Sequence, residues 1–154
     1  MSAACRRCSF SLIELVVVLV IIGIISGVAI PRFAHAAVRS RVQAAARRVM
    51  TDLNRLRRHA FQTSTKQAVV FDLTTHAYAM AGLSDPDKPG AYYIVSLADE
   101  PYQAEISAAN FSGQAKCVFD GFGKPEVGGI VTVKIGEDSR SIIVNPDTGE
   151  AYLQ

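Results

Sequence analysis

One acidic residue, Glu14, stands at the start of a long apolar run and is the most unusual candidate for chemistry in this sequence. Leu15 to Ile30 contain no charged residue, and Phe10 to Ile13 extend the apolar stretch on the other side of Glu14. A carboxylate inside such a stretch makes membrane insertion about 3 kcal/mol less favourable, so it predicts a cationic partner. If the chain is cut before Phe10, the new α-amino group lies about one helical turn from Glu14. A neighbouring copy of the helix, shifted along its axis, would then offer its amine to this carboxylate.

The apolar run has three interpretations. As a helix, Phe10 to Ile30 would measure roughly 31 Å, which matches the thickness of a bilayer's hydrocarbon core. A core helix that is apolar on every face would need a larger protein around it. A secretory signal peptide is the third interpretation, with Arg6 and Arg7 as its basic start and Ala34-His35-Ala36 as its cleavage site. Against the signal peptide, the run is long, Glu14 interrupts it, and a helical pattern follows at once.

The order Ser9-Phe10-Ser11-Leu12-Ile13-Glu14, followed by the apolar run and Pro31, resembles the N-terminus of type IV pilins and type II secretion pseudopilins. The resemblance implies cleavage by a prepilin peptidase between Ser9 and Phe10 and N-methylation of Phe10. It also implies that Glu14, fifth in the mature chain, serves subunit assembly. Pro31 matches the family's proline, where the helix can bend because a backbone donor is missing. Ser9 departs from the family's usual Gly, but it is also small.

After Pro31 the spacing predicts an amphipathic helix that ends near Gln62-Thr63-Ser64. Its apolar stripe consists of Val38, Val42, Ala45, Ala46, Val49, Leu53, Leu56 and Ala60. The other side carries Arg39, Arg41, Arg47, Arg48, Arg55, Arg57 and Arg58. We expect the stripe to pack on the domain that follows and the Arg face to meet solvent or the acidic half of neighbouring subunits. Nucleic-acid binding is the alternative for the Arg face, but no aromatic residue interleaves with it to stack bases.

Charge divides the chain into two unlike halves. Residues 1–60 hold ten Arg and two acids, whereas residues 61–154 hold six basic and twelve acidic residues, net −6. The basic residues that follow the apolar run outnumber Arg6 and Arg7 before it, so the positive-inside rule alone predicts a cytoplasmic C-terminal domain. The family resemblance implies the reverse, and we follow it because the N-terminal motif is more specific than a charge count.

The C-terminal half has short alternating runs separated by Gly, Pro, Asn and Asp, which predict an antiparallel β domain. The expected strands are residues 68–73, 77–81, 92–97, 103–107, 116–119, 130–135, 141–144 and 150–153. The fold class is therefore α+β, with a long N-terminal helix packed on an antiparallel β-sheet or sandwich. The segments Phe119 to Pro125 and Ile142 to Glu150 resemble the β domain of H-type minor pseudopilins and related minor type IV pilins.

No catalytic or cofactor motif is present, so we expect neither enzymatic activity nor a cofactor. Cys5 and Cys8 have CxxC spacing without a second ligand pair. The segment Asp85 to Gly90 has calcium-loop character but lacks the closing Glu. Cys117 is expected to be a buried, small apolar side chain.

These observations predict a leader at residues 1–9, a transmembrane assembly helix at 10–30, a basic amphipathic helix at 31–64 and a β domain at 65–154. The resemblance implies a minor pseudopilin of a type II secretion pseudopilus, anchored in the bacterial inner membrane with its C-terminal domain in the periplasm. Its implied partners are prepilin peptidase, other major and minor pseudopilins and membrane lipid; nucleic acid is not expected. The alternatives are a minor type IV pilin acting in pilus assembly or DNA uptake, and an exported soluble β protein.

Overall fold

The computed structural model describes residues 11–85 and 90–154, and within the N-terminal helix it leaves out the side chains of residues 26–34. Ser9 and Phe10 lie outside the described residues, as do Cys5, Cys8 and most of the segment Asp85 to Gly90. The chain divides into two compact units, Met1–Ala37 and Val38–Gln154. Each unit is described by itself.

A single helix, α1, runs from Leu12 to Thr63 and includes Pro31. The expected membrane and amphipathic segments are therefore parts of one helix, while the bend at Pro31 and the four segment boundaries stay predictions. The helix ends where the sequence predicts. Ser64 adopts a left-handed conformation with φ of 51°, and the Thr65 N–H donates to the Ala60 carbonyl at 3.3 Å, which caps the last turn.

The predicted apolar stripe is the face of α1 that enters the core. Its members from Val42 to Ala60 are at most 1% exposed, and Val38 is half-buried. Asn54, beside the stripe, donates to the Ala151 carbonyl at 2.8 Å and accepts from the Ala151 N–H at 3.1 Å. These two bonds tie α1 to the last strand, so the helix is fixed to the domain by polar as well as apolar contacts.

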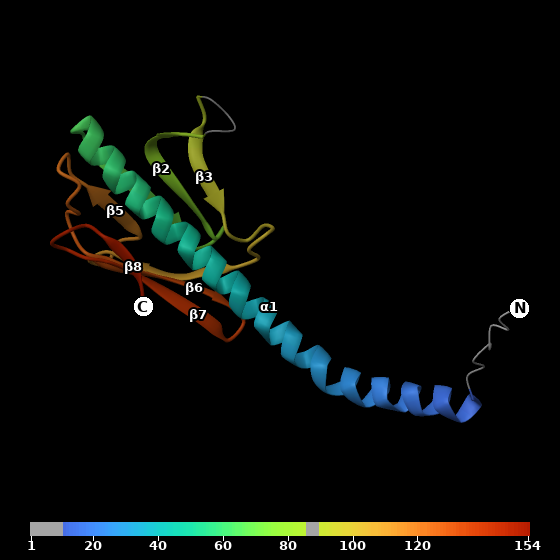
Figure 1. The fold of residues 1–154 in the computed structure, drawn as a ribbon. Helices are drawn as coiled ribbons and strands as arrows, with labels where there is room; N and C mark the ends of the chain where they lie inside the picture. Colours follow the sequence, from blue (N-terminus) through green and yellow to red (C-terminus); the bar gives the residue numbers. More distant parts are fainter. Residues whose placement is uncertain (1–10, 86–89) are drawn as a thin grey trace, which may run out of the picture. The chain divides into compact units, whose positions relative to one another are not determined.

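Eight strands form two antiparallel four-stranded sheets in the unit that begins at Val38 (Figure 1). The first sheet has the order β3-β2-β1-β5, with β1 Gln67–Asp72, β2 Ala77–Ser84, β3 Tyr92–Ser96 and β5 Lys116–Phe119. The second sheet has the order β4-β6-β7-β8, with β4 Glu105–Asn110, β6 Gly129–Ile135, β7 Asp138–Val144 and β8 Ala151–Leu153. The α+β fold class and all eight expected strands are confirmed.

The start of β4 differs from the predicted one. The sequence predicts a strand from Gln103, but β4 begins at Glu105. Gln103 has a φ of 50° and its N–H donates to the Asp99 carbonyl at 3.0 Å, so it closes a turn and cannot pair in a ladder. The alternation of polar and apolar residues cannot reveal this turn, because the turn depends on a backbone hydrogen bond and not on side-chain polarity.

One hydrophobic core joins the α1 stripe to both sheets. Phe71 of β1 stacks on Phe111, just after β4, with ring centroids 6.0 Å apart, which links the two sheets. Cys117 is 1% exposed in this core, which confirms its expected apolar role. Burial raises the pKa of its thiol to about 12, so the thiol stays protonated at neutral pH.

Candidate functional site

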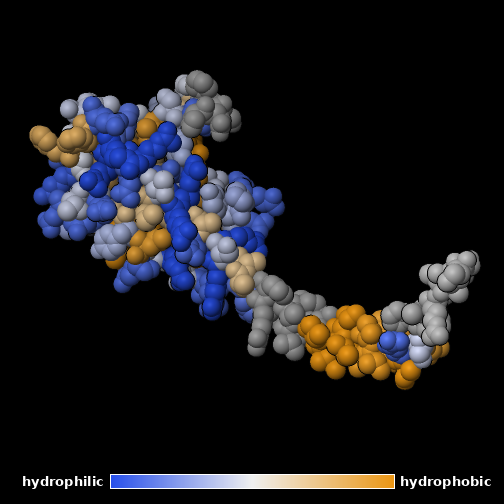
Figure 2. Space-filling model, viewed as in Figure 1, coloured by the Kyte–Doolittle hydropathy of each residue, from blue (hydrophilic) through white to orange (hydrophobic). Residues whose placement is uncertain are grey.

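The first turns of α1 expose apolar side chains on every face of the helix. From Leu12 to Ile25 each large apolar side chain is 44% to 80% exposed. Figure 2 shows this stretch as a continuous apolar band. A helix that is apolar all round requires cover from lipid or protein. Within the residues that the structure describes, no helix has both the length and the apolarity that crossing a bilayer demands.

Glu14 is the acidic residue in the first turn of α1, and it is exposed beside this apolar band. The helix starts at this point, because the Ser11 carbonyl accepts hydrogen bonds from the N–H groups of Glu14 at 3.1 Å and Leu15 at 3.2 Å. Among the described residues, Glu14 forms no ion pair. Its carboxylate is therefore available to a cation brought by another molecule.

The arginine face of α1 is not simply a solvated surface. Arg39 forms an ion pair with Asp138 at 3.4 Å, and Arg41 donates a hydrogen bond to Gln103. Arg55 lies over the ring of Tyr93, with 5.4 Å from its guanidinium carbon to the ring centroid. The sequence predicted solvent or neighbouring subunits as the partners of this face, but part of it binds the chain's own β domain.

A buried carboxylate, Asp52, forms the centre of a polar cluster under α1. It is 3% exposed and accepts hydrogen bonds from the Tyr78 hydroxyl at 2.7 Å, the Tyr93 hydroxyl at 3.2 Å and the Arg48 Nε at 3.0 Å. Arg48 also donates to the Tyr93 hydroxyl. We call Arg48, Asp52, Tyr78 and Tyr93 the Asp52 cluster.

The side chains of the Asp52 cluster keep their protons and hold the helix and strands together. Burial, and then the nearby charge of Asp52, raise the pKa of both Tyr78 and Tyr93, so the phenols remain donors. Burial opposes the charge of Arg48, but Asp52 and the two tyrosines outweigh it and raise the pKa of the guanidinium. Through the hydrogen bonds of Tyr78 and Tyr93 to Asp52, the cluster clamps β2 and β3 to the middle of α1.

Sequence reasoning missed the Asp52 cluster. Asp52 counted only as one of two acids in a basic region. The available signal was its spacing of four residues from Arg48, which puts the two side chains on one helix face. The tyrosines lie 26 and 41 residues further along the chain. Sequence spacing therefore could not predict that their hydroxyl groups bind Asp52.

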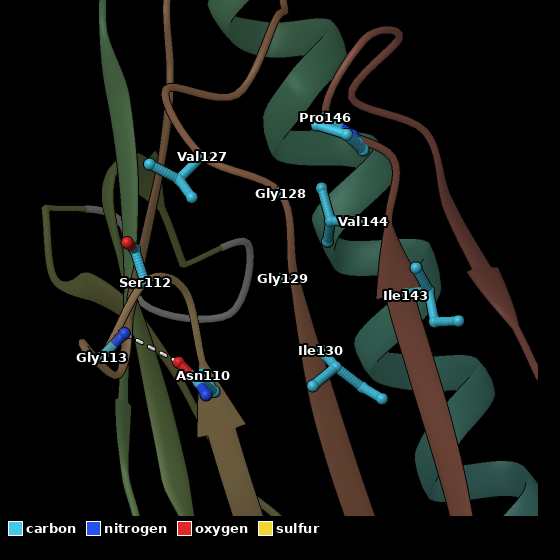
Figure 3. A pocket seen from close by; sticks show the side chains of 10 residues that line it. All are labelled: Asn110, Ser112, Gly113, Val127, Gly128, Gly129, Ile130, Ile143, Val144 and Pro146. Carbon is cyan, nitrogen blue, oxygen red and sulfur yellow. Dashed lines mark hydrogen bonds between the residues drawn. The ribbon is translucent and has the colours of Figure 1, made fainter.

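An open depression of about 660 Å³ lies between the loop that follows β4 and the end of β7. Figure 3 shows that its lining consists of apolar side chains, glycine backbone and the polar side chains of Asn110 and Ser112. The one polar contact drawn is the Gly113 N–H donating to Asn110 at 2.8 Å. None of its lining residues is titratable. The described residues also contain no group of three or more His, Cys, Asp or Glu side chains that could hold a metal ion.

Comparison with known proteins gives a match for the N-terminal residues and further matches for the fold. Residues 5–30 match the prokaryotic N-terminal methylation motif. The fold resembles the type IV minor pilin FimU of Pseudomonas aeruginosa, with a TM-score of 0.53 and 15% identity over 75% of this chain and 90% of that chain. It also resembles the minor pseudopilin EpsH from the type 2 secretion system of Vibrio cholerae, with a TM-score of 0.52 and 14% identity over 73% of this chain and 95% of that chain. None of the curated protein sequences matches the chain.

Proposed function

We propose that this chain, which is type IV pilin-like in both its N-terminal motif and its fold, is a minor pseudopilin of a type II secretion pseudopilus. The observation that carries the proposal is the joining of two features in one helix. The first turns of α1 expose an apolar band that begins at a lone carboxylate, and its later turns dock on a two-sheet domain. This design suits a subunit that assembles through its helix and presents its β domain. Its work is mechanical and not enzymatic.

The N-terminal steps of the proposal rest on residues 9, 10 and 14. Prepilin peptidase cuts between Ser9 and Phe10 and methylates the amine of Phe10. The exposed position of Glu14 in the first turn of α1 supports its role in assembly, since the amine of a neighbouring subunit can reach it. Neutralising both charges in an apolar setting favours one axial register over others.

The proposed location is the bacterial inner membrane, crossed once, with the C-terminal domain in the periplasm. The positive-inside count opposes this orientation, but the match of residues 5–30 to the prokaryotic N-terminal methylation motif supports it. The proposed partners are prepilin peptidase, lipid, and other major and minor pseudopilins.

A minor type IV pilin, acting in pilus assembly or DNA uptake, is the second candidate. The similarity to FimU favours it about as much as the similarity to EpsH favours the pseudopilin. The test is an in-frame deletion scored for both secretion and piliation. The pseudopilin proposal predicts that enzymes accumulate in the periplasm while pili remain. Normal secretion with loss of pili or of DNA uptake would support the second candidate instead.

A further inference from the structure

Two exposed aromatic rings lie beside two arginines at the C-terminal end of α1. Phe61 is 64% exposed and Phe122 is 85% exposed. Together with Arg57, Arg58 and Gln62 they line a depression of about 400 Å³. Figure 2 shows apolar surface next to strongly hydrophilic surface at this end of the domain. Apolar surface gathered within a polar rim is typical of an interaction site, and we call these five residues the Arg-Phe patch.

The loops around the Arg-Phe patch are held against the helix. Asp120 accepts a hydrogen bond from the Phe122 N–H at 2.9 Å, which closes the turn that follows β5. Gly123 and Gly149 pack on Arg57 so closely that an added Cβ at either position would lie 3.3 Å from its side chain. The turn therefore presents the ring of Phe122 to solvent in a fixed position, which lowers the entropy that a partner must remove on binding.

The two arginines of the patch are available to an anion from another molecule. The four ion pairs among the described residues include neither Arg57 nor Arg58. By contrast, the Asp52 cluster engages Arg48 through an ion pair and Arg55 through the ring of Tyr93. The middle of the helix therefore uses its arginines within the domain, whereas the Arg-Phe patch offers two guanidinium groups beside two exposed rings.

The surroundings of the patch favour a short acidic segment over a long polyanion. The loops that pack on Arg57 through Gly123 and Gly149 also carry Asp120, Asp147 and Glu150. These carboxylates would repel the phosphates of a nucleic acid strand that continued past the two arginines. A protein loop with one or two carboxylates beside an apolar side chain can reach both guanidinium groups and both rings without crossing the acidic loops.

The position of the patch in the domain leaves it open to a neighbour. Arg58 lies twenty residues along α1 from Val38, a distance of about 30 Å, and Val38 is where the N-terminal unit joins. A partner at the patch therefore contacts the β domain and the end of α1, and its contact adds to the one proposed for Glu14. Since the chain is proposed to be a minor subunit, the neighbour at this end is a different chain.

We propose that the Arg-Phe patch binds a different pilin-like subunit, through a surface loop of that subunit in which carboxylates flank an apolar side chain. Arg57 and Arg58 pair with the carboxylates, and the apolar side chain packs between Phe61 and Phe122. Charge-assisted hydrogen bonds beside apolar surface are stronger than solvated ones, because the rings exclude water. The inference rests on the proposed function and names the surface of this chain that meets its neighbour.

Photo-cross-linking of the full chain in cells tests the contact. Phe122 is replaced by the photoreactive p-benzoylphenylalanine while the other pilin-like subunits of the same system are present. Irradiation is expected to give an adduct between this chain and one other pilin-like subunit, identified by mass spectrometry. The matched control places the same photoreactive group at Tyr92, which is 74% exposed on β3 and lies outside the patch. This control is expected not to give that adduct.

Charge reversal separates a specific contact from chance proximity. Adding Arg58→Glu to the Phe122 photoprobe should abolish the adduct. Arg47→Glu should leave the adduct intact, since Arg47 is also exposed on α1 and forms no ion pair among the described residues, but lies outside the patch.

Three results would overturn the inference. They are an adduct that survives Arg58→Glu, an adduct that joins only two copies of this chain or links it to nucleic acid, and the absence of any adduct from a chain that still co-purifies with other pilin-like subunits. A chain without the photoprobe that does not co-purify with such subunits would contradict the proposed function itself, and the inference with it.

Discussion

The phenol of Tyr78 donates a 2.7 Å hydrogen bond to the carboxylate of Asp52, and this contact joins β2 to the middle of α1. Both side chains are almost fully buried. A carboxylate in such a place is stable only when donors surround it, and Tyr93 and Arg48 supply the others. The contact therefore helps to attach the β domain to the helix that is proposed to carry it in a filament.

Replacing Asp52 by Ala should destabilise the β domain by about 2 to 4 kcal/mol, because two phenols and one guanidinium lose their acceptor under α1. Chemical unfolding of the full chain in detergent, followed by circular dichroism, measures the change. Asp147→Ala is the matched control, since Asp147 is exposed and its side chain forms no ion pair among the described residues. Equal stability of the two variants would show that the Asp52 cluster does not clamp the helix.

Stability should fall as the pH rises above about 10. The pKa of Tyr78 is raised above its ordinary value of 10.0 in the folded chain, chiefly by burial and then by Asp52. Between the unfolded and folded pKa values the unfolded chain loses this proton and the folded chain keeps it, so alkali favours unfolding. In Tyr78→Phe the decline should be shallower, although the variant is about 1 to 3 kcal/mol less stable at pH 7. Parallel pH profiles for the two proteins would contradict the assignment.

Sequence reasoning predicted the elements well because each depends on local spacing. The stripe from Val42 to Ala60 follows the helical period, and the eight strands lie between turn residues. The polar contacts of the Arg face were not predictable. Arg55 meets Tyr93, and Arg41 meets Gln103, only after the β domain folds against the helix. The residues proposed to act at the N-terminus came from a motif, and Ser9 and Phe10 lie outside the described residues.

Cys117 should be unreactive in the folded mature chain. It is 1% exposed in β5, and burial raises the pKa of its thiol to about 12, so very little thiolate is present at neutral pH. A thiol-specific reagent is expected to label the protein processed after Ser9 only after denaturation, when the rate should approach that of a free cysteine. Rapid labelling under native conditions would mean that β5 opens readily.

Changing Glu14 to Gln should leave the protein in the membrane fraction but remove it from assembled filaments. Gln keeps the size of the side chain and loses the charge that would attract the N-terminal amine of a neighbour. Quantitative immunoblotting of membrane and sheared-filament fractions measures both pools. Glu150→Gln, an exposed change in the β domain, serves as the control. Normal incorporation of Glu14→Gln would refute the assembly role.

The intact mass of the protein purified from membranes is the most direct test of the account as a whole. Cleavage after Ser9 and methylation of Phe10 predict the mass of residues 10–154 plus one methyl group. Both changes should require an active prepilin peptidase. An intact N-terminus in cells with that peptidase, or a chain that begins at Ala37 after signal-peptide cleavage, would contradict the pilin-like processing from which the proposed function follows.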